Sequence, residues 1–297
     1  DACLVGSEMC IRDRNNISHS YNPNDPNPIY ALNPFSMTWE NGKRYAILGP
    51  SGCGKTTMLN IVSGLVRPSA GNILFDDKDV TDLKTESRNI AQVFQFPVIY
   101  NTMTVYENLA FPLKCRDFLK DKIDERVESV ADILNLQSFL NSPARKLTAD
   151  QKQLISLGRG LVREDVAAVL MDEPLTVIDP DLKFRLRRKL KEINEEFKTT
   201  LVYVTHDQNE AMTFADNIIV MSEGEVVQSG TPKELFERPN TTFVGYFIGS
   251  PAMNLFETEA SSNDSVKINN TIIKTSTNLS NLKDKKIKLG IRSEFIK

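Results

Sequence analysis

The sequence is poor in the residues that build disulfide frameworks and zinc sites. It has only four cysteines, two histidines and one tryptophan in 297 residues, and no two cysteines form a C-x-x-C pair. Such spacings argue against a disulfide scaffold and against a zinc site. We therefore expect a protein of a reducing compartment, the cytoplasm.

Long apolar runs and an excess of positive charge are also missing. No apolar run reaches the roughly 18 residues that a membrane-spanning helix needs, so the chain is not expected to cross a membrane by itself. Lys and Arg number 36 against 39 Asp and Glu, a formal net charge of −3. A nucleic-acid binder would instead carry a basic footprint. The composition, 40% hydrophobic and 25% charged, is typical of a globular protein.

The two ends of the chain differ from the rest. Residues 1–14 show no sustained periodicity, hold two of the four cysteines and lack the basic and apolar regions of a secretory signal. They resemble sequencing adapter that has been read through as protein, so we expect a non-native segment there. The last residues, GIRSEFIK, follow an apolar-alternating stretch without a cap. We expect the chain to be cut off inside a further domain.

Apolar runs alternate with helical patterns over most of the chain. Strand patterns occupy residues 45–48, 89–94, 166–171 and 200–205. The last two are apolar on both faces, as strands of a parallel sheet are. An amphipathic helix follows the first strand, with Leu65 on its apolar side, and a long one lies between the last two. The alternation predicts an α/β fold with a mostly parallel sheet and helices on both faces.

Two further regions depart from this alternation. Residues 102–163 are helical in pattern and predict a helical insertion subdomain. From residue 251 the composition shifts toward Asn, Ser, Thr and Lys with short β-branched runs, which indicates the truncated start of an all-β unit. We expect one main domain over residues 15–250 and a partial second domain over residues 251–297.

A glycine-rich segment follows the first strand directly. Residues 49–57 read GPSGCGKTT and fit the pattern G-x-x-x-x-G-K-[ST]; we call them the phosphate loop. The glycines let successive N–H groups face a phosphate, and the following helix adds its positive dipole end. A P-loop NTPase is predicted, with Lys55 reaching the β- and γ-phosphates of the nucleotide and Thr56 ligating Mg²⁺. The predicted nucleotide-binding residues are Gly49, Pro50, Ser51, Gly52, Cys53, Gly54, Lys55, Thr56 and Thr57.

An acidic pair ends a later strand pattern. Asp172 and Glu173 follow the buried run VLM, at the carboxyl end of a strand, where α/β folds bind ligands. Asp172 is predicted to hold Mg²⁺, usually through water, and Glu173 to accept a proton from attacking water. On its own, such a pair is more often a loop or a helix cap. Together with the phosphate loop it predicts a nucleotide triphosphatase.

The remaining motifs narrow the class of protein. The segments GPSGCGKTT, VFQ, DEPLTVID, LVYVTHD and GTPKELFERP follow one another along the chain. In this order they closely resemble the ATP-binding subunits of ABC importers, over nearly everything from about residue 17 to residue 296. TMTVYENLAFPLK and GIRSEFI match the branch that serves sugars, polyols and glycerol phosphates. The resemblance implies an ATP-hydrolysing motor subunit with a C-terminal OB-like regulatory domain.

The resemblance also assigns roles by position. Gln95 would contact Mg²⁺ and the attacking water and sense the permease. His206 would contact the γ-phosphate and orient that water, with Glu173 as the base. Asp179 would lie at a dimer interface. These assignments imply a catalytic set of Glu173, His206 and Gln95.

Two parts of the implied nucleotide site remain to be named. By the same resemblance, Mg²⁺ would be held by Thr56, Gln95 and Asp172. An aromatic residue upstream of the phosphate loop usually stacks on adenine in the family. We choose Tyr21 for this role, with Tyr30 as the alternative.

The family signature LSGGQ is altered in this chain. At its place the sequence reads LTADQ, and the residues that would meet the nucleotide are Thr148, Ala149, Asp150 and Gln151. Asp150 puts a carboxylate where the partner subunit's ATP is negative, and like charges about 4 Å apart cost roughly 4 kcal/mol at an effective dielectric near 20. Alternatively, Asp150 only favours a helix N-terminus, by about 0.3–1 kcal/mol. We expect an asymmetric pair in which a different ATPase subunit is the partner.

The implied assembly is a peripheral complex on the cytoplasmic face of the bacterial inner membrane. Its partners would be integral-membrane permease subunits, a second ATPase subunit and, indirectly, an external solute-binding protein, with no nucleic acid. Glycerol-type solutes are the leading substrate guess. The alternatives are an ATP-binding regulatory subunit with little turnover and an ABC ATPase outside transport. A nucleotide kinase would not explain Gln95, Asp179 and His206 in order.

Overall fold

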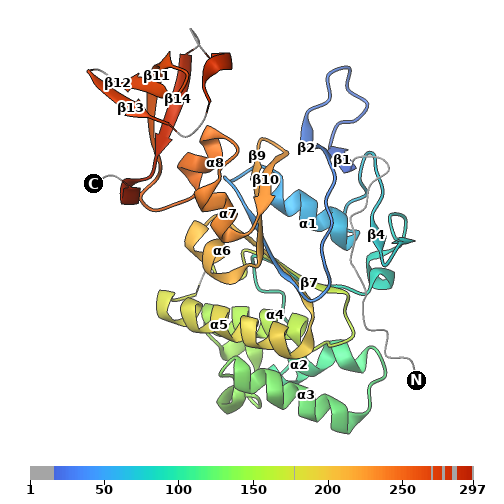
Figure 1. Cartoon of the computed structure of the whole chain (residues 1–297). Helices are drawn as coiled ribbons and strands as arrows, with labels where there is room; N and C mark the ends of the chain where they lie inside the picture. Colours follow the sequence, from blue (N-terminus) through green and yellow to red (C-terminus); the bar gives the residue numbers. More distant parts are fainter. Residues whose placement is uncertain (1–16, 177, 269, 276–277, 283–285, 296–297) are drawn as a thin grey trace. The chain divides into compact units, whose positions relative to one another are not determined.

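The computed structural model describes residues 17–176, 178–268, 270–275, 278–282 and 286–295 (Figure 1). The predicted non-native segment, residues 1–14, lies outside these ranges. By contacts the chain divides into two compact units, Asp1–Val226 and Val227–Lys297, which are described separately. The domain boundaries set at residues 15–250 and 251–297 remain a proposal.

The first unit is built on a six-stranded sheet, whose edge strand β10 continues past the unit boundary at Val226. The strands are β3 (Arg44–Leu48), β6 (Ala91–Val93), β7 (Ala168–Asp172), β8 (Thr200–Thr205), β9 (Asn217–Ser222) and β10 (Glu225–Gly230). Their order is β10-β9-β3-β8-β7-β6, and every pairing among β6, β7, β8, β3 and β9 is parallel. The mostly parallel sheet expected from the sequence is therefore confirmed.

Helices and two small antiparallel pairs complete this unit. The helices are α1 (Lys55–Ser63), α2 (Val105–Lys114), α3 (Lys120–Ile133), α4 (Ala149–Leu161), α5 (Pro180–Phe197) and α6 (Gln208–Phe214), and the paired strands are β1 (Ile17–Ser20) with β2 (Tyr30–Phe35) and β4 (Leu74–Phe75) with β5 (Lys78–Asp79). Helices α2 and α3 pack side by side, and both contact α4 (Figure 1). These three helices form the helical region that the sequence predicts, and its bounds at about residues 102–163 remain a proposal.

The predicted position of Leu65 in the first helix is wrong. Helix α1 ends at Ser63 because Gly64 takes a left-handed conformation, with φ of +82°, and returns its N–H to the carbonyl of Ile61. A glycine in this conformation is a common helix terminator. Leu65 therefore lies beyond the helix and is half exposed.

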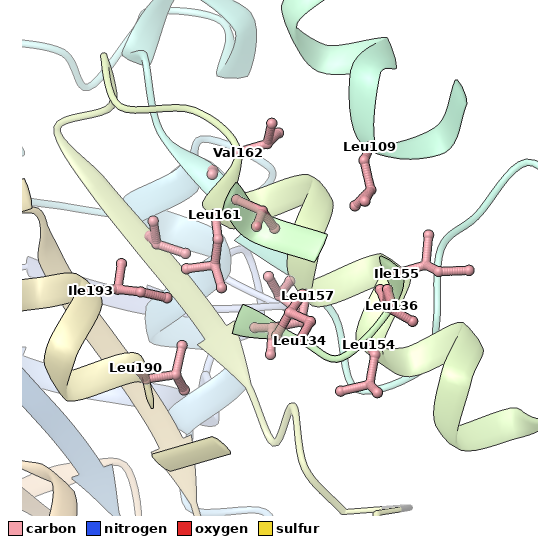
Figure 2. Close-up of a cluster of buried hydrophobic side chains, with 14 of the residues drawn as sticks. Leu109, Leu134, Leu136, Leu154, Ile155, Leu157, Leu161, Val162, Leu190 and Ile193 are labelled. Carbon is pink, nitrogen blue, oxygen red and sulfur yellow. The ribbon is translucent and has the colours of Figure 1, made fainter. Parts of the chain in front are cut away.

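The sheet is buried on both faces, and strand alternation explains how. Val169 and Met171 of β7 belong to a cluster with side chains of α4 and α5, part of which Figure 2 shows. Ala168 and Leu170, their neighbours on the same strand, belong to a second cluster with side chains of α1. Successive residues of a strand point to opposite faces. Side chains of β7 therefore pack against helices on both faces of the sheet. Because helices cover both faces of the sheet, the carboxyl ends of its strands are the place where a ligand site is expected.

The second unit contains a four-stranded antiparallel sheet and two short helices. Its elements are α7 (Pro232–Glu237), α8 (Thr242–Phe247), β11 (Asn254–Ser262), β12 (Ser265–Ile268), β13 (Thr271–Lys274) and β14 (Lys286–Ile291). The strand order is β13-β12-β11-β14. This is the start of the all-β OB-like domain that the sequence predicts.

A buried arginine ties the helices of this unit to its sheet. Arg292, just after β14, donates to the carbonyl oxygens of Phe236 at 2.9 and 3.0 Å, of Gly245 at 3.2 Å, and of Ile248. Its guanidinium also lies 4.1 Å from the Phe236 ring centroid. The guanidinium therefore supplies hydrogen-bond donors to three main-chain carbonyl oxygens.

We expect Arg292→Met to lower the opening free energy of α7 and α8 by about 2 kcal/mol, because it removes the hydrogen bonds that the guanidinium donates to three carbonyl oxygens. Hydrogen exchange of peptides that span residues 232–248 measures this. The control is Lys233→Met, which changes an exposed cation on α7. Equal protection in Arg292→Met and the native chain would contradict the assigned role.

Candidate nucleotide site

The phosphate loop has the backbone that its glycines predict. It connects β3 to α1, with φ of +79° at Gly52 and +101° at Gly54. A Cβ at Gly54 would lie 2.5 Å from the carbonyl oxygen of Ala31, so only glycine fits there. Gly54 is the N-cap of α1 and makes no side-chain cap. The first N–H groups of α1 are therefore available to an anion.

Lys55 is held inside this loop. Its side chain is buried, and its ammonium donates to the carbonyl oxygens of Gly49 and Pro50, both at 2.8 Å. A fixed ammonium at the base of a glycine-rich loop is suited to phosphate oxygens. The role of Lys55 at the β- and γ-phosphates stays a prediction.

Thr56 and Asp172 come together from neighbouring elements. Asp172 ends β7 and is buried, and it accepts a hydrogen bond from the Thr56 hydroxyl. Burial raises the pKa of Asp172, and the Glu173 carboxylate adds to this, while the Thr56 hydroxyl and the Lys55 ammonium oppose it. An incoming cation would favour the ionised carboxylate.

Glu173 and His206 form a pair at the ends of adjacent strands. Oε1 of Glu173 lies 3.0 Å from Nδ1 of His206, and the Thr176 hydroxyl donates to Oε2 at 3.3 Å. The Glu173 backbone has φ of +44°, a region that is costly for a residue with a Cβ. Its N–H donates to the carbonyl of Val204 in β8 at 3.0 Å. The arrangement suits a general base oriented by two polar neighbours.

These residues surround one open pocket of about 590 Å³. Of the predicted site residues, the pocket is lined by Tyr21, Ser51, Gly52, Gly54, Lys55, Thr56, Thr57, Gln95, Glu173 and His206. The Tyr21 hydroxyl lies 3.1 Å from Oγ1 of Thr57, and the Tyr21 ring makes an edge contact with His19 at 4.6 Å. Tyr30, the alternative adenine partner, is not among the lining residues.

Other predicted residues lie outside this pocket. The Asp179 carboxylate caps α5 by accepting from the N–H groups of Asp181 and Leu182. Thr148 and Gln151 form a reciprocal cap at the start of α4, which places the LTADQ segment on the helical subdomain. Within a single chain the structure therefore does not bring the signature to the phosphate loop.

Sequence reasoning missed two residues that contact the acidic segment. Thr176 lines the pocket and holds the Glu173 carboxylate; its place three residues after Glu173 was an available signal. Gln153 is fully buried in α4 and donates to the carbonyl of Pro174 at 2.8 Å. Nothing in a helical pattern signals that contact, because its partner lies 21 residues away.

The donor set fits Mg²⁺ better than a metal held by protein alone. Over the described ranges, no group of three or more His, Cys, Asp or Glu side chains could hold a metal ion. Thr56 lines the pocket, and its hydroxyl donates to the buried Asp172 carboxylate, which is not itself among the lining residues. Mg²⁺ is typically bound by one or two carboxylates together with substrate phosphates, and these residues fit that mode.

A phosphate loop, a carboxylate at a strand end and a parallel sheet define a P-loop nucleotide-binding protein. Residues 32–176 match the family described as ABC transporter, and residues 249–296 match the MalK OB fold domain. The chain belongs to the ABC transporter family. Curated relatives that it matches are named as ATP-binding proteins of sn-glycerol-3-phosphate import and of trehalose/maltose import.

Two curated relatives and one solved structure illustrate the likeness. The sn-glycerol-3-phosphate import ATP-binding protein UgpC of Yersinia pestis bv. Antiqua (strain Antiqua) is 47% identical over 73% of this chain and 60% of its own length. UgpC 3 of Agrobacterium fabrum is 43% identical over 80% of this chain and 67% of its own length. The dimeric ATP-binding cassette MJ0796 with ADP and phosphate is 28% identical, with a TM-score of 0.65, over 76% of this chain and 98% of that one. The match thus spans about three fifths of the Yersinia relative.

Proposed function

We propose that this chain is the ATP-hydrolysing motor subunit of an ABC importer. It would power the uptake of a sugar, polyol or glycerol-type solute through a separate permease. The observation that carries the proposal is the Glu173–His206 pair, which lines the same pocket as the phosphate loop. The relatives named for sn-glycerol-3-phosphate import support a glycerol-type solute.

Each residue has a task in the proposed reaction. Lys55 and the N–H groups of the phosphate loop bind the β- and γ-phosphates. Glu173 takes the proton of the attacking water, and His206 orients that water against the γ-phosphate. Thr56, Asp172 and Gln95 would hold Mg²⁺, which neutralises charge on the phosphate oxygens.

The remaining predicted residues would act between two subunits. In the proposed dimer, Thr148, Ala149, Asp150 and Gln151 meet the partner's ATP, Asp179 lies at the interface, and Tyr21 stacks on adenine. The dimeric cassette among the similar structures supports a paired arrangement. Because the LTADQ segment carries Asp150, we propose that the partner ATPase subunit is a different chain.

The proposed complex sits on a membrane. Permease subunits would anchor this chain at the cytoplasmic face of the bacterial inner membrane, and an external solute-binding protein would deliver the solute. Over the described part of the chain, no helix has the length and apolar character to cross a bilayer. Asp150 favours one competing function, an ATP-binding regulatory subunit with little turnover.

We expect Lys55→Ala to weaken ATP binding, because the ammonium is the fixed cation of the loop. Charge-assisted contacts of this kind contribute roughly 1.5–3 kcal/mol each, so the Kd should rise at least about tenfold. Calorimetric titration with Mg-ATP measures it, with the exposed Lys43→Ala as control.

A second measurement, Mg-dependent release of phosphate from ATP, decides between the two proposed functions. The proposal requires turnover in the native chain or in a variant whose signature is restored to LSGGQ. ATP binding without turnover in both would leave the regulatory subunit as the function. Failure to bind ATP would overturn both proposals.

A further inference from the structure

A buried carboxylate on α6 divides its two oxygens between two neighbouring elements. Glu210 is 6% exposed. Its Oε2 accepts from the hydroxyls of Tyr203 and Thr205 in β8, both at 2.9 Å. Its Oε1 faces α5, with Nη1 of Arg187 at 3.4 Å and Nζ of Lys183 at 3.6 Å. One side chain thus connects a strand and a helix.

These contacts leave the carboxylate little freedom. A buried charge is tolerated only where ionic and hydrogen-bonding partners surround it, and Glu210 has both kinds. Burial and the Glu210 carboxylate raise the pKa of Tyr203 well above its usual value, so the hydroxyl stays a donor. The Tyr203 ring packs on Phe214 at 5.1 Å, at the other end of α6. The carboxylate position is therefore fixed from several sides.

The strand side of this network leads directly to His206. Thr205, whose hydroxyl donates to Glu210, is the residue before His206. The same hydroxyl accepts the N–H of Asp207, the residue after it, at 3.0 Å. The His206 side chain is 56% exposed, and its ring nitrogen Nδ1 meets Glu173. The direction of the imidazole therefore depends on its backbone, which Glu210 holds through Thr205.

The helix side leads to the start of α5. Lys183 donates its N–H to the carbonyl of Asp179 at 2.8 Å in the first turn, and Arg187 lies one turn further on. Asp179 caps this helix. The histidine loop and the N-terminal half of α5 therefore share one carboxylate.

We propose that Glu210 is a positioning residue for His206, which fixes the histidine loop to α5. The proposal deepens the ATPase function. The expected loss of ATP turnover rests on that function, whereas the expected displacement of the imidazole does not. Losing the tie displaces the imidazole from its place beside Glu173. ATP turnover then falls while ATP binding, which uses the phosphate loop, is retained.

Two substitutions weaken the ion pairs between Glu210 and α5. Glu210→Gln keeps the size of the side chain, and its carbonyl oxygen can still accept from the β8 hydroxyls, but it presents an uncharged amide to Lys183 and Arg187. Arg187→Met removes a cation and leaves Glu210 intact. Glu192→Gln is the control, because Glu192 pairs with Arg188 and Lys189 on the exposed side of the same helix.

Histidine-selective ¹⁵N NMR reads the geometry without any need for turnover. The chain has two histidines, so one signal pair belongs to His206 and the other, from His19, is an internal reference. We expect Glu210→Gln and Arg187→Met to shift the His206 ring signals while those of His19 stay in place. Glu192→Gln should shift neither. Unchanged His206 signals in both folded variants would overturn the proposal, and Arg187→Met decides alone if Glu210→Gln does not fold.

Kinetics give the second readout, in whichever chain turns ATP over. We expect Glu210→Gln to lower kcat by roughly 10- to 100-fold, the cost of a small displacement of a catalytic group, with KM for ATP within about twofold. In a His206→Ala background the same change should cost nothing further. An additive loss would mean that Glu210 acts only on stability, and the proposal would fail. If no chain hydrolyses ATP, the proposed function fails and NMR still decides the role of Glu210.

Discussion

Glu173→Gln should nearly abolish ATP hydrolysis and leave ATP binding unchanged. The amide cannot accept the proton of the attacking water, and loss of a general base typically costs about 10²–10⁴ in rate. The change is isosteric, so the amide can remain within reach of Thr176 and His206 and the pocket keeps its shape. Phosphate release measures kcat in the native chain or, where the altered signature prevents turnover, in the chain restored to LSGGQ, and calorimetry with Mg-ATP measures binding.

A matched control distinguishes the loss of the general base from an effect of the substitution on a positive-φ backbone. Glu223 lies exposed in the turn between β9 and β10 and also has a positive φ, +50°. Glu223→Gln therefore makes the same chemical change in a similar backbone conformation, and it should keep full activity. Turnover above about a tenth of the native rate in Glu173→Gln would remove Glu173 from the role of base.

Restoring the signature should raise turnover of the isolated chain by tenfold or more. The restored chain carries Thr148→Ser, Ala149→Gly and Asp150→Gly. In a dimer of this chain with itself, Asp150 would face the partner's phosphates, at a cost of up to roughly 4 kcal/mol, or about a thousandfold. Serine keeps the helix cap that Thr148 now supplies to α4. Comparison of kcat in the native and restored chains measures the effect.

A single substitution shows whether charge is the cause. Asp150→Asn removes the charge, keeps the side-chain size and gives up only about 0.3–1 kcal/mol of helix-dipole interaction. It should recover most of the gain. Equal turnover in the native and restored chains would show that Asp150 is harmless. The argument for a different partner subunit would then fail, and a functional homodimer would replace it.

Local rules explain why the phosphate loop could be predicted in detail. The strand before it, the positive φ at Gly52 and Gly54 and the burial of Lys55 all depend on residues 44–63. The roles of Asp172 and Glu173 could be predicted only by combining their place at the end of a buried strand with the phosphate loop, because such a pair alone is more often a loop or a helix cap.

Residues that act through distant contacts could not be predicted in this way. Glu210 reads as an exposed residue in a short polar helix, and only the packing of α5 against α6 shows why it is buried. Gln153 occupies an unremarkable helical position, although it contacts the segment after Glu173. Leu65 fits the helical period, but the conformation of Gly64 ends the helix first.

The register of β7 against β8 sets the distance between the side chains of Glu173 and His206. Asp172 pairs with Val204, and the N–H of Glu173 continues this ladder to the Val204 carbonyl. A shift of one residue in the register of β7 against β8 would move Glu173 by about 3.3 Å relative to His206. It would also turn the side chains of β7 to the opposite face of the sheet. We therefore expect a one-residue insertion or deletion within residues 168–173 to abolish catalysis, because it shifts Glu173 relative to His206.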